Sequence, residues 1–257
     1  MKNHPLILFV GLLIVACSVG CNRMNIDPSQ NATSQLCSDI LGPEAIYWDV
    51  RNGIPRGDLP GGVPTIKNPG GQFSHPGFPL LGFMYPAGWN PETLTDPSGT
   101  TVGVNLYRQD NQAIYRWTSY QAPGIVPVED VLTVEINGML DFFGNPGTIQ
   151  RICINEGTDN SLGNIIRAGA SRLIRAGGLS AIVNVNLTYV DGLPNTFISV
   201  QITAGPTAEF NPLIVDTFLP IDWQMLINPS DSSVFDDSDG DGVNDVYDNF
   251  PNDPTRW

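Results

Sequence analysis

The C-terminal segment carries oxygen ligands at a spacing that suits a hard cation. Counting from Asp237 as position 1, aspartates recur at positions 3, 5, 9 and 12, with glycine at 6 and valine at 7. Alternate side chains at positions 1, 3 and 5 converge on one ion, the glycine permits a sharp turn, and the carbonyl of residue 7 is a ligand. The sequence therefore predicts a Ca²⁺ site formed by Asp237, Asp239, Asp241, the Val243 carbonyl, Asp245 and Asp248.

The segment DSDGDGVNDVYDNFPNDP, residues 237–254, resembles a thrombospondin type-3 repeat in its bacterial form, with Phe-Pro where animal repeats have Cys-Pro. The resemblance implies that aspartates wrap calcium with little regular secondary structure, and that Asp253 serves a neighbouring ion. An EF-hand fits less well, because Pro229 and Pro251 flank the loop and Asp248 stands where glutamate is usual. Repeats of this family are usually stacked, so a lone loop implies weak binding, roughly 10⁻⁴ to 10⁻³ M.

The charge distribution leaves one alternative for this segment. Residues 231–257 contain eight aspartates and one arginine, so they hold half of the net charge of −14. A run of like charges is also typical of a solvated, unstructured tail that binds nothing. Nucleic-acid binding is excluded as a class, because it requires clustered lysine and arginine.

The N-terminus has the pattern of a secretion signal. A short basic start precedes an apolar run of 11 residues, Leu6–Ala16, which is shorter than the roughly 20 residues that span a bilayer as a helix. The next residues, IVAC (14–17), resemble the bacterial lipoprotein box, which implies cleavage before Cys17 and its lipidation. Cys21, in SVGC, is the alternative lipidation site. Ser18 after Cys17 suggests the outer membrane. We expect a lipid-anchored protein of the cell envelope.

The remaining cysteines bear on this choice. Cleavage at Cys21 would leave Cys37 and Cys153 as an even pair that could form a disulfide in an oxidising compartment. Cleavage at Cys17 would leave three further thiols. The box favours Cys17, and the pairing of Cys37 with Cys153 stays open.

Catalytic constellations are sparse in the sequence. After removal of the signal, His75 is the only histidine, no Gly-x-Ser-x-Gly element surrounds a serine, and no Cys/His cluster has zinc-ligand spacing. Carboxylates could still pair in space, as glycosidases require; the candidates are Asp49, Asp141, Glu129 and Glu156. Three arginines, Arg167, Arg172 and Arg175, are interpreted as a solvated helix face, or else as a modest anion site.

Periodicity predicts the elements that would position these groups. Alternating apolar residues predict strands over 80–89, 101–108, 112–120, 181–190 and 196–204, with a further strand over 148–154. Helical spacing predicts helices over 128–143 and 162–176, the second capped by Asn160 or Ser161 and stopped by Gly177-Gly178. A last helix begins at Asn211-Pro212 and is interrupted at Pro220.

This order predicts an α+β fold, a largely antiparallel sheet with two or three packed helices, followed by a short irregular calcium-binding tail. We expect a signal peptide at 1–16, a lipidated N-terminus and tether at 17–38, the α+β domain at 39–230 and the acidic tail at 231–257. The Gly/Pro-rich stretch 53–79 is either an extended arm on the domain or a loose loop, and any strand in it must be short or at an edge.

The body of the chain resembles the PsbP-like α/β sandwich, on the motif FMYPAGW (83–89), the element order after it, and the late segment TAEFNPLIVDTFLPI before a final helix. The resemblance covers about residues 75–228 and implies a binding or assembly-assisting protein rather than an enzyme. We therefore expect a non-catalytic, lipid-anchored envelope protein that binds a partner or ligand, with calcium stiffening its C-terminus. The alternative is an envelope hydrolase that uses a carboxylate pair, with calcium as a structural accessory.

Overall fold

A computed structural model describes residues 40–53, 64–225, 238 and 252–253 of the 257-residue chain. The expected signal peptide, Cys17, Cys21, Cys37, the tether and the calcium ligands Asp237, Asp239, Asp241, Val243, Asp245 and Asp248 lie outside the described residues. Every helix in the described part of the chain is too short or too polar to span a lipid bilayer.

The centre of the fold is a seven-stranded antiparallel sheet with strand order β3-β4-β5-β9-β8-β7-β6. Its strands are β3 (Trp89–Thr95), β4 (Val102–Arg108), β5 (Ile114–Pro123), β6 (Gln150–Asp159), β7 (Ile165–Ala176), β8 (Leu179–Val190) and β9 (Asn195–Pro206). A separate two-stranded sheet pairs β1 (Pro69–His75) with β2 (Phe78–Pro86). The α+β prediction with a largely antiparallel sheet is confirmed.

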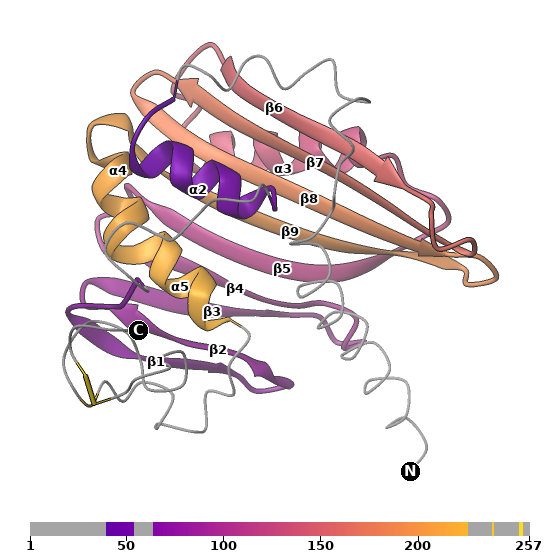
Figure 1. Ribbon diagram of the computed structural model, residues 1–257, viewed down its shortest axis with the longest axis horizontal. Helices are drawn as coiled ribbons and strands as arrows, with labels where there is room; N and C mark the ends of the chain where they lie inside the picture. Colours follow the sequence, from indigo (N-terminus) through magenta and orange to yellow (C-terminus); the bar gives the residue numbers. More distant parts are fainter. Residues whose placement is uncertain (1–39, 54–63, 226–237, 239–251, 254–257) are drawn as a thin grey trace.

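Helices cover both faces of the large sheet (Figure 1). Helix α3 (Val128–Phe142) lies on one face, over β7 and β8. On the other face lie α2 (Pro43–Arg51) and the C-terminal helical stretch, which comprises η3 (Thr207–Glu209), α4 (Phe210–Leu213), η4 (Ile214–Phe218) and α5 (Leu219–Gln224). The β1–β2 hairpin packs beside α5 on this second face, so the molecule has three layers.

Two apolar clusters fill the spaces between these layers, and alternation along the strands assigns residues to each. Val183 and Val185 of β8 and Val200 and Ile202 of β9 face α3. Their neighbour Ile182 faces the α2 side, with Val104 and Leu106 of β4. The predicted inward faces of β4, β8, β9 and α3 are confirmed, because helical or two-residue periodicity coincides with burial in all four.

The second predicted helix, residues 162–176, is wrong: this segment is strand β7, and Gly177-Gly178 form its turn into β8. Leu173 is buried on the α2 face and Ile174 on the α3 face, so the strand has no solvent-facing row to give alternation. The adjacent apolar pairs Ile165-Ile166 and Leu173-Ile174 fit helical spacing as well as they fit a strand that is buried on both faces, so periodicity did not separate the two. The cap expected at Asn160 or Ser161 is instead the β6–β7 turn.

The C-terminal helical stretch differs from its prediction in two ways. It begins at Thr207, before Asn211-Pro212, and Pro220 does not end it. Because Pro220 has no N–H to donate to the carbonyl four residues earlier, the preceding turn widens to the π-helical stretch η4. That turn places Phe218 at the centre of the α2-side core, where four aromatic rings lie with centroids 6.1–6.4 Å from it; they belong to Tyr47, Trp89, Tyr115 and Phe210.

The part of the Gly/Pro-rich stretch that the structure describes contains β1. As expected for such a composition, β1 pairs only with β2 and lies outside the large sheet. Its His75 is buried, with Nδ1 accepting the Gly77 N–H at 3.1 Å and Nε2 donating to the Leu94 carbonyl at 3.1 Å. Both ring nitrogens are therefore committed to the backbone, which gives His75 a structural role.

Candidate functional site

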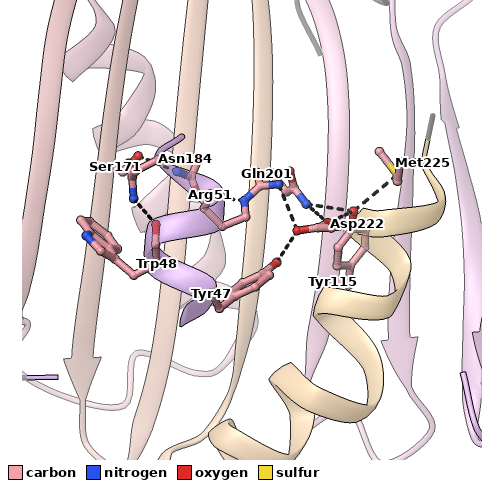
Figure 2. Close-up of polar contacts among 10 residues, drawn as sticks. Tyr47, Trp48, Arg51, Tyr115, Ser171, Asn184, Gln201, Asp222 and Met225 are labelled. Atoms are coloured by element: carbon pink, nitrogen blue, oxygen red, sulfur yellow. Dashed lines mark hydrogen bonds and ion pairs between the residues drawn. The ribbon is translucent and has the colours of Figure 1, made fainter. Parts of the chain in front are cut away.

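A group of hydrogen-bonded polar side chains from several elements surrounds Asp222 of α5 (Figure 2). Arg51 Nη1 donates to Asp222 Oδ2 at 3.0 Å, and the Tyr47 hydroxyl donates to the same oxygen at 2.8 Å. The Tyr115 hydroxyl donates to Oδ1 at 2.7 Å, and Gln201 Nε2 also donates to Oδ1. We call these five residues the Asp222 cluster.

Three elements, α2, β5 and β9, supply the hydrogen-bond donors to the Asp222 carboxylate of α5. Tyr47 and Arg51 are four residues apart on α2, so both side chains project from one side of the helix towards the sheet. Tyr115 of β5 lies opposite Thr203 of β9, which places it diagonally across the ladder from Gln201. The Gln201 amide also donates to the Tyr115 hydroxyl at 2.9 Å. The cluster therefore lies where α2 and α5 cross the β5–β9 pairing.

The electrostatics of the cluster are those of a neutralised buried charge. The Asp222 and Arg51 side chains are only 8% and 14% exposed, so their charges compensate each other in a poorly solvated space. Burial, followed by the nearby Asp222 carboxylate, raises the pKa of Tyr47 and of Tyr115 well above 10.0. Burial opposes the charge of Arg51, but Asp222 and the two tyrosines together still raise its pKa.

The network continues away from Asp222 along the sheet (Figure 2). Arg51 Nε donates to Asn184 Oδ1 at 3.4 Å, and Asn184 Nδ2 donates to Ser171 Oγ at 2.5 Å. The C-terminal end of α2 is further fixed by Asn155 of β6, whose Nδ2 donates to Asn52 Oδ1 at 2.9 Å. These hydrogen bonds orient α2 and α5 on the sheet. Each carboxylate oxygen of Asp222 accepts two of them.

Of the four candidate carboxylates, the structure brings two together. Arg172 Nη2 of β7 donates to Glu129 Oε1 at 2.5 Å and to Glu156 Oε2 at 2.7 Å. Asp49 lies on α2 and Asp141 on α3, on opposite faces of the sheet, so these two cannot meet. The Glu129–Glu156 pair shares a nearly buried guanidinium, and both carboxylates are about half exposed.

The arginines interpreted as one solvated helix face are placed differently. Since residues 167–175 form a strand, Arg172 faces α3 while Arg175 faces α2 and donates to Glu44 Oε2 at 2.8 Å. The solvated-face interpretation is wrong for Arg172, whose side chain is 6% exposed. Arg167 lies on the same face of β7 as Arg175 and Arg172 on the opposite face, so the three arginines do not form one anion site.

The remaining candidates are located as follows. Cys153 is buried on β6, in the apolar cluster on the α2 side that also contains Ile40. Among the described residues, no three His, Cys, Asp or Glu side chains lie close enough to hold a metal ion. Asp253 is described, while the six calcium ligands are not. The Asp222 cluster was not predicted from the sequence. A local sign of it is the spacing of Tyr47 and Arg51, which are four residues apart and so lie on one side of a helix.

No family model matches the chain, and no curated protein matches it. Among solved structures, the Saccharomyces cerevisiae Ran-binding protein Mog1p is 8% identical, with a TM-score of 0.26; the match covers 55% of this chain and 93% of that one. A point mutant of the protein Mog1 matches with 8% identity and a TM-score of 0.24, over 55% of this chain and 91% of that one. At these scores the shared geometry is too small to bear on function.

Proposed function

We propose that this chain is a lipid-anchored protein of the bacterial cell envelope, of binding or structural type, whose C-terminal segment binds Ca²⁺. The observation that carries the non-catalytic role is the saturation of Asp222. Each of its oxygens accepts two hydrogen bonds, and the charge is balanced by Arg51. A carboxylate held in this way stabilises the packing of α2 and α5 and has no lone pair directed at a substrate.

The lipid anchor and the outer-membrane location rest on the N-terminal sequence. The apolar run and the IVAC box direct the modification to Cys17, with Cys21 as the alternative. Labelling cells with a radioactive fatty acid tests both, using Cys17→Ser and Cys21→Ser. Loss of label in the Cys17 variant alone supports the proposal, and label retained in both variants contradicts it.

The calcium site rests on the spacing of Asp237, Asp239, Asp241, Val243, Asp245 and Asp248. The experiment is a thermal melt of the full chain in calcium and in chelator. A ligand that binds only the folded state at about 100 times its Kd adds about 2.7 kcal/mol to the free energy of unfolding. We expect a calcium-dependent rise in Tm that is lost in Asp239→Asn/Asp241→Asn.

The matched control is Asp231→Asn/Asp236→Asn, which removes the same charge from the same segment outside the loop. It should keep the full calcium response. Calorimetric titration separates a site that folds apart from the body, which gives heat without a change in Tm, from a solvated tail, which gives neither. An equal loss of response in both double variants would indicate a general charge effect and would overturn the site.

One observation favours the competing hydrolase hypothesis, namely the meeting of Glu129 and Glu156 at Arg172. Such an enzyme would hydrolyse chromogenic glycosides, and Glu129→Gln and Glu156→Gln would each abolish that activity. Because the Arg172 guanidinium stands between the two carboxylates, where a substrate would have to lie, we rank this hypothesis second. Activity lost in both variants would replace the non-catalytic proposal.

A further inference from the structure

A second polar cluster lies on the other face of the sheet, where β3, β4 and β5 continue beyond the strands that α3 covers. Its residues are Glu92 of β3, Asn105 and Tyr107 of β4, Arg116 and Tyr120 of β5, and Glu135 of α3. We call it the β3–β5 cluster. Glu92, Asn105 and Arg116 are register partners across three neighbouring strands, so their side chains form one row on the α3 side.

The cluster contains a buried acceptor that the described residues leave unsatisfied. Asn105 is 8% exposed, and its Nδ2 donates to Glu92 Oε2 at 3.3 Å and to the Tyr107 hydroxyl at 2.7 Å. Because a carboxylate only accepts, the amide nitrogen must face Glu92. Asn105 Oδ1 is therefore the group that has no hydrogen-bond partner within the described part of the chain.

A buried donor in the same row is also unsatisfied. Arg116 Nη1 pairs with Glu135 Oε2 at 3.4 Å, whereas Arg116 Nε is buried and finds no acceptor among the described residues. Buried polar groups in folded proteins are nearly always hydrogen-bonded, so the occurrence of two unsatisfied groups on adjacent strands calls for a ligand or a bound water. The two groups belong to residues that are register partners on neighbouring strands, and a hydroxyl, which both donates and accepts, can satisfy such an acceptor and donor together.

Charge and shape restrict the ligand further. Glu135 pairs with Arg116 and Glu92 accepts from Asn105, so the cluster carries one more negative than positive charge and would repel an anionic ligand. Aromatic rings border the row: Tyr107 lies against Phe142 of α3, with centroids 5.3 Å apart, and the Tyr120 hydroxyl donates to Glu135 Oε1 at 3.4 Å. Phe142 is 42% exposed, which leaves part of its ring available for contact.

We propose that the β3–β5 cluster binds a neutral polyhydroxylated ligand, a saccharide unit, with one hydroxyl bridging Asn105 Oδ1 and Arg116 Nε and the apolar face of the ring against Tyr107 and Phe142. Glu92 and Glu135 accept from further hydroxyls. This inference supplies the ligand class for the proposed binding role and rests on that role. The lipid anchor and the calcium site are tested by separate experiments, fatty-acid labelling and thermal melts, so a failure of saccharide binding would leave those two proposals standing.

The test is a calorimetric titration of the full chain, in a non-glycosidic detergent, with maltotriose and with triacetylchitotriose. The two trisaccharides distinguish a plain glucan from an acetamido-sugar polymer as the source of the ligand. We expect saturable heat with at least one of them. Arg116→Lys keeps the positive charge but lacks Nε, and Asn105→Leu keeps the volume but lacks Oδ1; each should weaken binding roughly tenfold or more.

Thr133→Ala, at an exposed position of α3, is the control and should bind as the parent does. Thermal melts of all variants report whether the fold is retained, and Arg116→Lys keeps the proposal testable if Asn105→Leu fails to fold. No saturable heat from either trisaccharide at millimolar concentration would mean that water satisfies the two groups, and would overturn the proposal. Binding that is unchanged in both variants would place the saccharide elsewhere and would also overturn it.

Discussion

Asn211 of α4 caps a helix that begins far earlier in the chain: its Oδ1 accepts the backbone N–H of Glu44, 167 residues away, at 3.1 Å in the first turn of α2. Gly42 stands at the N-cap of α2 and provides no side-chain acceptor. The first-turn N–H groups of a helix need such an acceptor from elsewhere. Asn211 supplies it across the tertiary structure, and so joins the two helical segments on this face of the sheet.

Replacing Asn211 should loosen α2. Asn211→Ala removes the acceptor, and loss of a cap costs about 1 kcal/mol of unfolding free energy. Asn211→Asp keeps an oxygen at the same place beside the positive end of the helix dipole and should cost less. Urea unfolding measures both. Equal losses in the two variants would contradict a capping role.

Removing the charge of Asp222 should destabilise the protein strongly. Asp222→Asn leaves Arg51 buried without its counter-ion, and breaking a buried pair in this way costs about 3–5 kcal/mol. The matched control is Asp216→Asn, because Asp216 pairs with Lys67 at 3.7 Å where both side chains are exposed. Such pairs contribute about 0–1 kcal/mol. Comparable losses in the two variants, measured by denaturant unfolding, would refute the role assigned to the Asp222 cluster.

Tyr120 should contribute to alkaline sensitivity. Burial, and then the nearby Glu135 carboxylate, raise its pKa from 10.0 to about 12. Since the folded-state pKa lies above the unfolded one, the stabilisation is complete below pH 10 and is lost as the pH rises towards 12. We expect the urea midpoint of Tyr120→Phe to fall less than that of the parent over this interval. The urea midpoint of Glu135→Gln should fall by an intermediate amount. Identical falls of the midpoint in all three proteins would count against the role assigned to Tyr120.

The pairing of Cys37 with Cys153 is a separate prediction. Cys153 belongs to the same buried cluster as Ile40, and Cys37 precedes Ile40 by three residues, a reach of about 10 Å of extended chain. Peptide mapping of protein isolated from the envelope, digested without reduction, should recover the cross-linked pair. Closing a loop of this length contributes about 4–5 kcal/mol in the chain-entropy model. Alkylation of Cys153 in the unfolded, unreduced protein would exclude the disulfide.

Elements whose apolar residues recur at one clear spacing were predictable from the sequence, whereas β7 has no such pattern. Strand β8 is also buried on both faces, but its Val183, Val185 and Leu187 alternate with polar residues, so it was predicted correctly. In α3, Val131, Leu132, Met139 and Leu140 recur at helical spacing because the opposite side of the helix meets solvent. Strand β7 is covered by α2 on one face and α3 on the other, so its apolar pairs matched a helix equally well. Its glycine-glycine turn at 177–178 was the overlooked signal for a hairpin.

Contacts between residues far apart in the sequence could not be located in advance, and the calcium site, whose ligands lie outside the described residues, stays a prediction. The calcium loop is a local pattern of 12 residues. The Asp222 cluster joins residues as far apart as Tyr47 and Asp222, which are separated by 175 positions, and no local pattern indicates that they meet. The row formed by Glu92, Asn105 and Arg116 likewise depends on strand register, which is fixed only when the sheet assembles.

The strand order has a consequence for how the chain folds. Within the large sheet of the described residues, every pairing joins consecutive strands except that of β5 with β9, where Tyr115 and Gln201 are 86 positions apart. Hairpins form within microseconds, whereas a long-range pairing must first overcome the entropy of closing the intervening loop. We therefore expect the β5–β9 ladder to be the slowest contact of the sheet to form. The Asp222 carboxylate lies on the last described helix and accepts hydrogen bonds from Tyr115 of β5 and Gln201 of β9. The C-terminal helix of the domain therefore stabilises the β5–β9 pairing once it has formed.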